Sequence, residues 1–204
     1  MLGPSRRSTT SARLKERFCS RDDDVSPLSL SFPALQRSPQ QDVQIDAQSL
    51  GPRQRRIQVQ IEVPVAIADL WTLLTDYNRL AEFIPNLSIS QQLPTHDGSI
   101  RLEQIGSQCF LRFRFCARVV LAMQEVPYDR LEFRMLEGDF EQFDGSWRFQ
   151  SVDADRTQLT YDVTLAPKLP MPIQLIETQL DQNLAANLLA IRAEAIRRFA
   201  SDRA

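Results

Sequence analysis

The chain has 204 residues, of which 43% are hydrophobic and 25% charged, a composition typical of a globular protein with one domain and a tail, or with two small domains. Its formal net charge of −2 does not favour nucleic acid as a partner. No apolar run approaches the roughly 20 residues that a membrane-spanning helix needs. Cys19, Cys109 and Cys116 lack metal-ligand spacing, and His96 is the single histidine. We therefore predict free thiols in a reducing compartment, no metal, no cofactor and no catalytic residues.

Residues 1–41 show no sustained hydrophobic period and are rich in Ser, Arg and Pro. We interpret them as a disordered tail before a single domain at 42–200. The first fifteen residues carry four basic and no acidic side chains, a composition typical of an organelle transit peptide. The alternative is a variable bacterial extension or a start site assigned too far upstream. The predicted location is cytoplasmic, with an organelle as the alternative.

The domain is expected to begin with a β-hairpin. Val43 and Ile45 alternate with polar residues, and Gly51-Pro52 then marks a turn. The second strand alternates four apolar residues with polar ones: Ile57, Val59, Ile61 and Val63. This alternation predicts two paired strands with one buried face.

Two short helical segments should follow the hairpin. Ala66, Leu70, Leu73 and Leu74 recur at helical spacing, with Trp71 on or beside their apolar face. Residues 75–85 then read as one or two further helical turns that stop at a proline.

The chain then alternates strands with short turn signals, which predicts antiparallel neighbours. We expect these strands at about 86–93, 99–107, 109–124, 131–137, 145–151 and 157–165. Four rows of side chains should point inward: Leu111, Phe113, Phe115 and Val119; Leu131, Phe133 and Met135; Trp147 and Phe149; and Leu159, Tyr161, Val163 and Leu165. The opposite face is polar, which predicts a sheet covered on one side only.

A long helix from about 172 to 199 should provide that cover. One apolar stripe runs along it at three- and four-residue spacing: Ile176, Leu180, Leu184, Leu188, Ile191 and Ala195. To bury both apolar surfaces the sheet must curl round this helix. We therefore predict an α+β fold, a curved antiparallel sheet of about seven strands wrapped round a long C-terminal helix. Such a fold leaves room for a concave, mostly apolar site.

Three stretches resemble the START-like superfamily of helix-grip domains, also called SRPBCC. They are VPVAIADLWTLLTDYNRLAEFIPNLSIS (63–90), RMLEGDFEQFDGSWRF (134–149) and LPMPIQLIETQLDQNLAANLLAIRAEAI (169–196). They are most similar to its polyketide cyclase/dehydrase and coenzyme Q-binding branch. The resemblance covers about residues 42–200 and implies a ligand cavity between the sheet and the last helix. Its members include quinone-binding chaperones, lipid carriers, plant hormone-binding proteins and aromatic cyclases.

We predict that the chain binds or carries a hydrophobic small molecule, an isoprenoid quinone or a lipid, without catalysis. The sequence lacks a recognisable pair of cavity residues for the acid/base work of a cyclase. The candidate ligand-binding residues are Trp71, Tyr77, Phe83, Ile84, Pro85, Phe113, Phe115, Phe133, Met135, Phe140, Trp147, Tyr161, Leu180, Leu184 and Asn187. Phe140 and Phe143 are expected in a loop at the strand tips, where they could form a hydrophobic lid.

Two other functions remain open. One is a cyclase- or dehydratase-type enzyme acting on an aromatic or polyketide-like substrate, with Tyr161, Glu103 or Arg101 as polar groups in the cavity. The other is a protein-interaction module, for example on a ribosome or a membrane complex, with the basic N-terminal segment as its docking arm.

The outer face of the predicted sheet carries a row of arginines: Arg112, Arg114, Arg118, Arg134 and Arg148. One interpretation is peripheral contact with anionic membrane headgroups. The other is a solvated face with cross-strand ion pairs to Glu132 and Asp162. Nucleic acid is not expected, because the aromatic side chains that would stack on bases lie on the opposite face.

Overall fold

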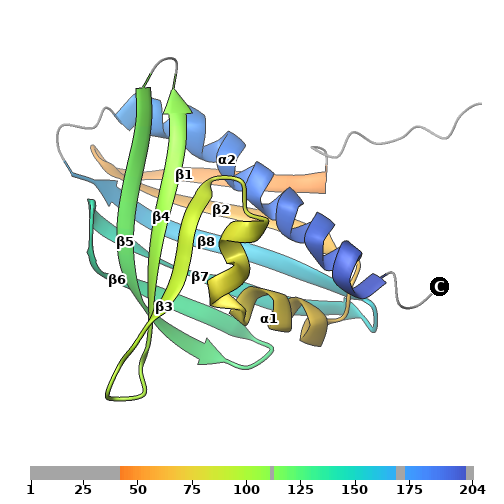
Figure 1. Cartoon of the computed structure of the whole chain (residues 1–204). Helices are drawn as coiled ribbons and strands as arrows, with labels where there is room; N and C mark the ends of the chain where they lie inside the picture. Colours follow the sequence, from red (N-terminus) through yellow and green to blue (C-terminus); the bar gives the residue numbers. More distant parts are fainter. Residues whose placement is uncertain (1–41, 111–112, 169–172, 201–204) are drawn as a thin grey trace, which may run out of the picture. The chain divides into compact units, whose positions relative to one another are not determined.

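An antiparallel sheet of eight strands curves round one long helix in the computed structural model (Figure 1). The structure describes residues 42–110, 113–168 and 173–200, with side chains described outside 107–115 and 173–182. The predicted tail at 1–41 therefore lies outside the described residues. The strands are β1 (Val43–Gly51), β2 (Gln54–Val63), β3 (Leu87–Leu93), β4 (Ile100–Phe110), β5 (Phe113–Val126), β6 (Arg130–Gly138), β7 (Phe140–Asp153) and β8 (Arg156–Pro167). The helices are α1 (Ile67–Thr75), the 3₁₀ helix η2 (Tyr77–Glu82) and α2 (Ile173–Ala195), which continues into one π-helical turn, η3 (Ile196–Ala200).

The strand order in the sheet is β1-β2-β8-β7-β6-β5-β4-β3. After β2 the chain passes through α1 and η2 to the opposite edge of the sheet, and then returns strand by strand until β8 pairs with β2. Short turns connect consecutive strands from β3 onward, which is why each of them pairs with its predecessor. The two short helices are the predicted ones, and they carry the chain across the open end of the curved sheet (Figure 1).

The first hairpin forms as predicted, but one of its strands is more exposed than expected. Every second residue of β2 is buried, as the alternation requires. In β1, by contrast, Ile45 is 39% exposed and both faces meet solvent over most of the strand. The reason is position: β1 is the edge of the sheet. An ion pair of 3.0 Å between Arg192 and Asp42 ties α2 to the residue that precedes β1.

Two strand boundaries differ from the prediction. β4 continues through Gln108 to Phe110, whereas a break was expected at that point. β7 begins at Phe140, so Phe140 and Phe143 lie in a strand and not in a loop at the strand tips. Pairing with β8 explains the second difference, because Phe140 and Phe143 lie opposite Pro167 and Leu165 in its register. Sequence patterns show turn residues, but they do not show a partner strand that extends beyond them.

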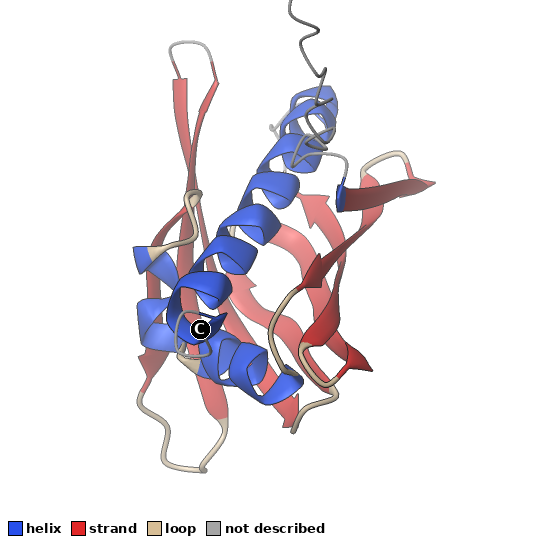
Figure 2. Cartoon of the chain, turned by 90° about the vertical axis from the view of Figure 1, so that its right-hand side faces the viewer, coloured by secondary structure: helices blue, strands red, loops and turns tan. Residues whose placement is uncertain are grey.

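The helix α2 lies along the concave side of the sheet (Figure 2). Leu184, Leu188, Ile191 and Ala195 are buried, which confirms this part of the predicted stripe. Ile176 and Leu180, also part of that stripe, have side chains outside the described residues. Within the described part of the chain, no helix is long and apolar enough to cross a bilayer.

The convex face of the sheet carries cross-strand ion pairs. Arg118 on β5 contacts Glu103 on β4 at 2.6 Å and Glu137 on β6 at 2.5 Å. Arg56 on β2 similarly contacts Asp162 on β8 at 2.6 Å. Among the arginines predicted for this face, Arg134 and Arg148 are exposed, whereas the side chains of Arg112 and Arg114 lie outside the described residues. The predicted partners differ: Asp162 pairs with Arg56, and Glu132 pairs at 2.8 Å with Arg130 of its own strand. Exposed ion pairs of this kind each contribute little stability.

Candidate ligand cavity

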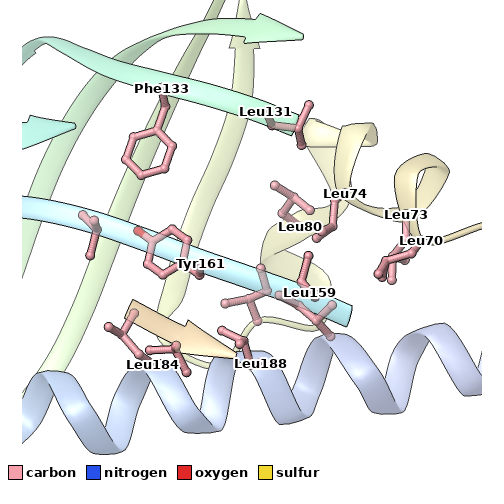
Figure 3. Packing of buried hydrophobic residues seen from close by; sticks show 14 of the residues in the cluster. Leu70, Leu73, Leu74, Leu80, Leu131, Phe133, Leu159, Tyr161, Leu184 and Leu188 are labelled. Carbon is pink, nitrogen blue, oxygen red and sulfur yellow. The ribbon is translucent and has the colours of Figure 1, made fainter. Parts of the chain in front are cut away.

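A cavity of about 280 Å³ lies between the concave face of the sheet and α2. Its wall takes side chains from every strand between β3 and β8, and from α1, η2 and α2. Figure 3 shows Phe133 and Tyr161 on the sheet side of this space, with Leu184 and Leu188 of α2 facing them. Pockets for small molecules commonly span about 300–1,000 Å³, so this one suits a ring-sized group.

Five aromatic side chains form a continuous row along the sheet side of the cavity. Their ring centroids lie 5.3 Å apart from Phe140 to Phe143, 5.6 Å from Phe143 to Phe133, 5.8 Å from Phe133 to Tyr161 and 4.2 Å from Tyr161 to Trp147. Trp147 and Tyr161 are direct cross-strand partners, so the alternation of β7 and β8 puts both rings on the concave face. The row presents flat apolar surfaces against which a planar ligand could stack.

The opposite wall is aliphatic. Leu184 and Leu188 come from one face of α2, and Leu74, Leu80 and Ile84 come from the segment between β2 and β3. All five are less than one tenth exposed. Helical spacing on α2 and the crossing of α1 and η2 therefore close the cavity with leucine-rich surface.

Two pairs of neutral polar side chains occur in or beside the wall. The amide Nδ2 of Asn86 donates to Oδ1 of Asn187 at 3.1 Å, which joins the start of β3 to α2. Gln104 donates from Nε2 to the hydroxyl of Ser90 at 3.3 Å. Each amide keeps further hydrogen-bonding capacity, since Asn and Gln have two donor hydrogens and one acceptor oxygen.

Tyr77 is a second kind of polar group in the wall. Its hydroxyl donates to Oε1 of Glu125 at 2.6 Å, and its carbonyl oxygen accepts from the Ser90 hydroxyl at 2.6 Å. Burial raises the pKa of Tyr77 above its ordinary value, and the hydrogen bond to the Glu125 carboxylate raises it further. Tyr77 is therefore a protonated, already satisfied donor that fixes η2 to β5 and β3.

Tyr161 differs from Tyr77 in having no such partner. It is 7% exposed, lines the cavity, and its hydroxyl makes no hydrogen bond within the described part of the chain. Burial raises the pKa of Tyr161 above its ordinary value, with a smaller contribution from the negative charge of Asp162. The hydroxyl thus stays protonated in the cavity.

No Asp, Glu, Lys, Arg or His side chain occurs among the described residues that line the cavity. Cys116 contributes an exposed thiol. The described residues also contain no cluster of three or more His, Cys, Asp or Glu side chains able to hold a metal ion. The arrangement can bind an uncharged apolar molecule and offer it hydrogen bonds.

The structure brings together eight of the predicted ligand-binding residues around this cavity. They are Tyr77, Ile84, Phe133, Phe140, Trp147, Tyr161, Leu184 and Asn187. Their role in binding remains a prediction. Phe113, Phe115 and Leu180 have side chains outside the described residues.

Four predicted residues lie away from the cavity. Trp71 of α1 packs on Tyr128 and Phe149, with ring centroids 5.7 and 5.3 Å away. The ring of Phe83 lies under the guanidinium of Arg198 at 5.6 Å. Pro85 is exposed, and Met135 packs against the core without lining the cavity.

The residues suggested for an enzymatic role on β4 also lie elsewhere. Glu103 pairs with Arg118, and Arg101 lies 3.7 Å from Asp97, both on the side of the sheet away from the cavity. The alternation of β4 explains this, because Leu102 and Gln104 face inward. The same period-of-two pattern is the signal that could have identified Gln104. Asn86 has no such signal, since its place depends on how α2 docks.

A family model described as polyketide cyclase/dehydrase and lipid transport matches residues 63–192, from the end of β2 through most of α2. The chain belongs to this family. The matched region thus includes both short helices, the six strands from β3 to β8 and most of the helix that closes the cavity.

The relatives of this member of the polyketide cyclase/dehydrase and lipid transport family are named for different functions. The ribosome association toxin RatA of Pseudomonas aeruginosa is 31% identical over 102 residues, which is 50% of this chain and 68% of that protein. The Zhui aromatase/cyclase of Streptomyces sp. R1128 shares the fold with a TM-score of 0.62 at 19% identity, over 71% of this chain and 95% of that one. A STAR-related lipid transfer protein of Xanthomonas axonopodis has a TM-score of 0.61 at 16% identity, over 76% of this chain and 93% of that one. These similarities establish the helix-grip, START-like fold.

Proposed function

We propose that this protein binds and carries a hydrophobic small molecule, an isoprenoid quinone or a lipid, in the cavity between the sheet and α2. The observation that carries the proposal is the composition of the wall, which is aromatic on the sheet side, aliphatic on the helix side, and free of charged side chains among its described residues. A buried charged substrate would need a partner there, and acid/base chemistry would need titratable groups near a common atom. Lipid transport is one of the activities that the family description names.

The energetics favour an affinity suitable for a carrier. Removing ~400 Å² of ligand apolar surface from water yields roughly 10 kcal/mol. Loss of translational and rotational freedom and the desolvation of polar groups remove several kcal/mol of this. A micromolar dissociation constant is the expected outcome.

The first experiment is native mass spectrometry of the protein purified from its own source, followed by solvent extraction of what it carried. A stoichiometric quinone or lipid, recovered unchanged, supports the carrier proposal. A recovered product that differs from the molecule supplied would instead favour the cyclase- or dehydratase-type enzyme. An empty protein that also fails to bind a panel of such compounds would contradict the proposal.

Two variants on β5 test whether the cargo binds in this cavity. Ala117 lines the cavity, whereas Ala122 lies on the other face of the strand, opposite Arg101 and Arg134 in register. Ala117→Phe should fill the cavity and lose the cargo, and the matched Ala122→Phe should keep it. Equal cargo in both variants would place the binding site elsewhere.

The similarity to the ribosome association toxin favours one second candidate, a module that associates with ribosomes. Sedimentation of the full chain with ribosomes on a sucrose gradient tests it. A chain lacking residues 1–41 then shows whether the basic tail is the docking arm. Binding that survives this deletion would assign the contact to the domain, and absence of the full chain from the ribosomal fractions would dismiss this candidate.

A further inference from the structure

One polar group in the cavity wall, the Tyr161 hydroxyl, has no hydrogen-bond partner among the described residues. The Tyr161 side chain is buried to more than nine tenths, and its hydroxyl has no hydrogen-bond partner in the described part of the chain. Tyr77, the other tyrosine of the wall, donates to Glu125. The hydroxyl oxygen is not among the fully buried unpaired atoms of the described chain, so it is reached from the cavity, where water or a bound molecule can accept its hydrogen bond.

The surroundings of this hydroxyl indicate the shape of that molecule. The Tyr161 ring lies 4.2 Å from the ring centroid of Trp147, and it is stacked with Phe133 at 5.8 Å and an interplanar angle of 17°. The donor therefore projects from a row of flat rings. A planar ring can lie against this row while an oxygen at its edge accepts from the hydroxyl, whereas a flexible acyl chain gains less from such surfaces.

The lack of charged groups in the described cavity wall favours a ligand without charge. The described lining carries no ionised side chain, and burial raises the pKa of Tyr161, so the phenol remains a neutral donor. At the other side of the cavity, the amides of Asn86 and Asn187 bond to each other and retain a donor and an acceptor for a second polar atom. A ligand with an oxygen at each side of an apolar ring would match both groups.

We propose that the Tyr161 hydroxyl anchors the cargo by donating to a carbonyl-type oxygen on an uncharged planar ring. This inference rests on the proposed carrier function and assigns the ring class of cargo, rather than the acyl class, to the cavity. Tyr161 acts as the residue that sets specificity for the oxygen, and the aromatic row sets specificity for the ring.

The test compares three probes by equilibrium dialysis against the full chain. The first is the naphthoquinone whose free quinone-ring positions are both methylated, so that the Cys116 thiol cannot add to it. The second is the corresponding dimethylnaphthalene, which has the ring without oxygens, and the third is methyl laurate, which has a carbonyl without the ring. Each is measured on the wild type, on Tyr161→Phe, and on the matched control Tyr128→Phe, a tyrosine 54% exposed and outside the cavity.

We expect the wild type to bind the quinone about three- to tenfold more tightly than the dimethylnaphthalene, the range of a single net hydrogen bond. Tyr161→Phe should abolish this preference by weakening quinone binding alone, and Tyr128→Phe should retain it. Because the hydroxyl has no partner in the described part of the chain, the free Tyr161→Phe variant should melt at the same temperature as the wild type or higher. If the variant nevertheless fails to fold, the wild-type preference decides by itself.

Different outcomes would contradict the Tyr161 anchor, the ring class of the cargo and the carrier function. Equal wild-type affinities for quinone and dimethylnaphthalene, or a preference that survives in Tyr161→Phe, would overturn the anchor while leaving the carrier function intact. Methyl laurate binding as tightly as the quinone, with the same loss in Tyr161→Phe, would overturn the ring class. A wild type that binds none of the three probes would refute the carrier function itself.

Discussion

Gly145 on β7 and Phe133 on β6 are cross-strand partners, and the aromatic ring occupies the space that a side chain at Gly145 would need. A Cβ atom built on Gly145 would clash first with the backbone carbonyl oxygen of Asp162, and it would lie 2.6 Å from Cζ of Phe133 and 3.0 Å from Cα of Val163. The missing side chain thus leaves room both for the backbone of β8 and for the Phe133 ring, which belongs to the aromatic row of the cavity.

Gly145→Ala should therefore destabilise the fold by about 1–3 kcal/mol, the usual range for overpacking, and displace the Phe133 ring into the cavity. Urea unfolding measures the first effect and probe affinity the second. Gly106→Ala is the matched control for stability, because a Cβ there would meet its nearest neighbour, the Asn86 carbonyl oxygen, at an ordinary 3.6 Å. Equal stability of the two variants would show that the sheet relaxes round residue 145.

Leu188 on α2 is completely buried, at 0% exposure, where the helix meets the cavity. Leu188→Ala should lower the free energy of unfolding by about 2–5 kcal/mol, the sum of lost burial and residual cavity. Leu136→Ala removes the same atoms from a side chain that is 46% exposed and should change stability by less than about 0.5 kcal/mol. Chemical denaturation of both variants checks the contrast, and similar losses would mean that α2 does not pack on the sheet as described.

The hydrogen bond between Tyr77 and Glu125 joins η2 to β5 across 2.6 Å. Tyr77→Phe leaves the partly buried Glu125 carboxylate without this donor, so we expect a loss of about 1–3 kcal/mol. A double-mutant cycle with Glu125→Ala, which removes the acceptor oxygen, isolates the pair, and a favourable coupling energy above about 0.5 kcal/mol is the expected result. Additive effects of the two substitutions would indicate that the contact contributes no net stability.

Glu194 accepts hydrogen bonds from Arg197 at 2.7 Å and from Arg198 at 2.6 Å near the end of α2. The bond from Arg197 is the main reason that the pKa of Glu194 falls from an ordinary 4.5 to about 2 in the folded chain. Because the folded pKa is the lower one, this group stabilises the fold above about pH 5, and the contribution is lost as the pH falls toward 2.

The difference in unfolding free energy between wild type and Glu194→Gln should therefore shrink as the pH is lowered from 7 to 3. Comparing the two proteins removes the background of other carboxyl groups with lowered pKa values, such as those of Glu82 and Glu103. Denaturant titrations at intervals of half a pH unit are sufficient. A difference that stays constant over this range would mean that the Glu194 carboxylate has an ordinary pKa.

Much of the architecture could be predicted from local patterns. Alternation placed Val163 and Tyr161 on the buried face of β8, and helical spacing placed Leu184 and Leu188 toward the sheet. These patterns are reliable because side-chain direction follows directly from the period of a strand or helix. The resemblance of 63–90, 134–149 and 169–196 to a known family led to the same fold.

The sequence by itself determined the order of elements, the inward rows and the closing helix, since each depends on residues near one another in the chain. Only the tertiary structure decided which inward residues meet a cavity and which meet each other. Trp71 belongs to the same aromatic class as Trp147, yet it packs on Phe149 and Tyr128 while Trp147 lines the cavity. The curvature of the sheet and the docking of α2 make that distinction, and both arise from packing between segments far apart in the sequence. The same long-range packing leaves the Tyr161 hydroxyl without a hydrogen-bond partner among the described residues, which no local pattern of residues encodes.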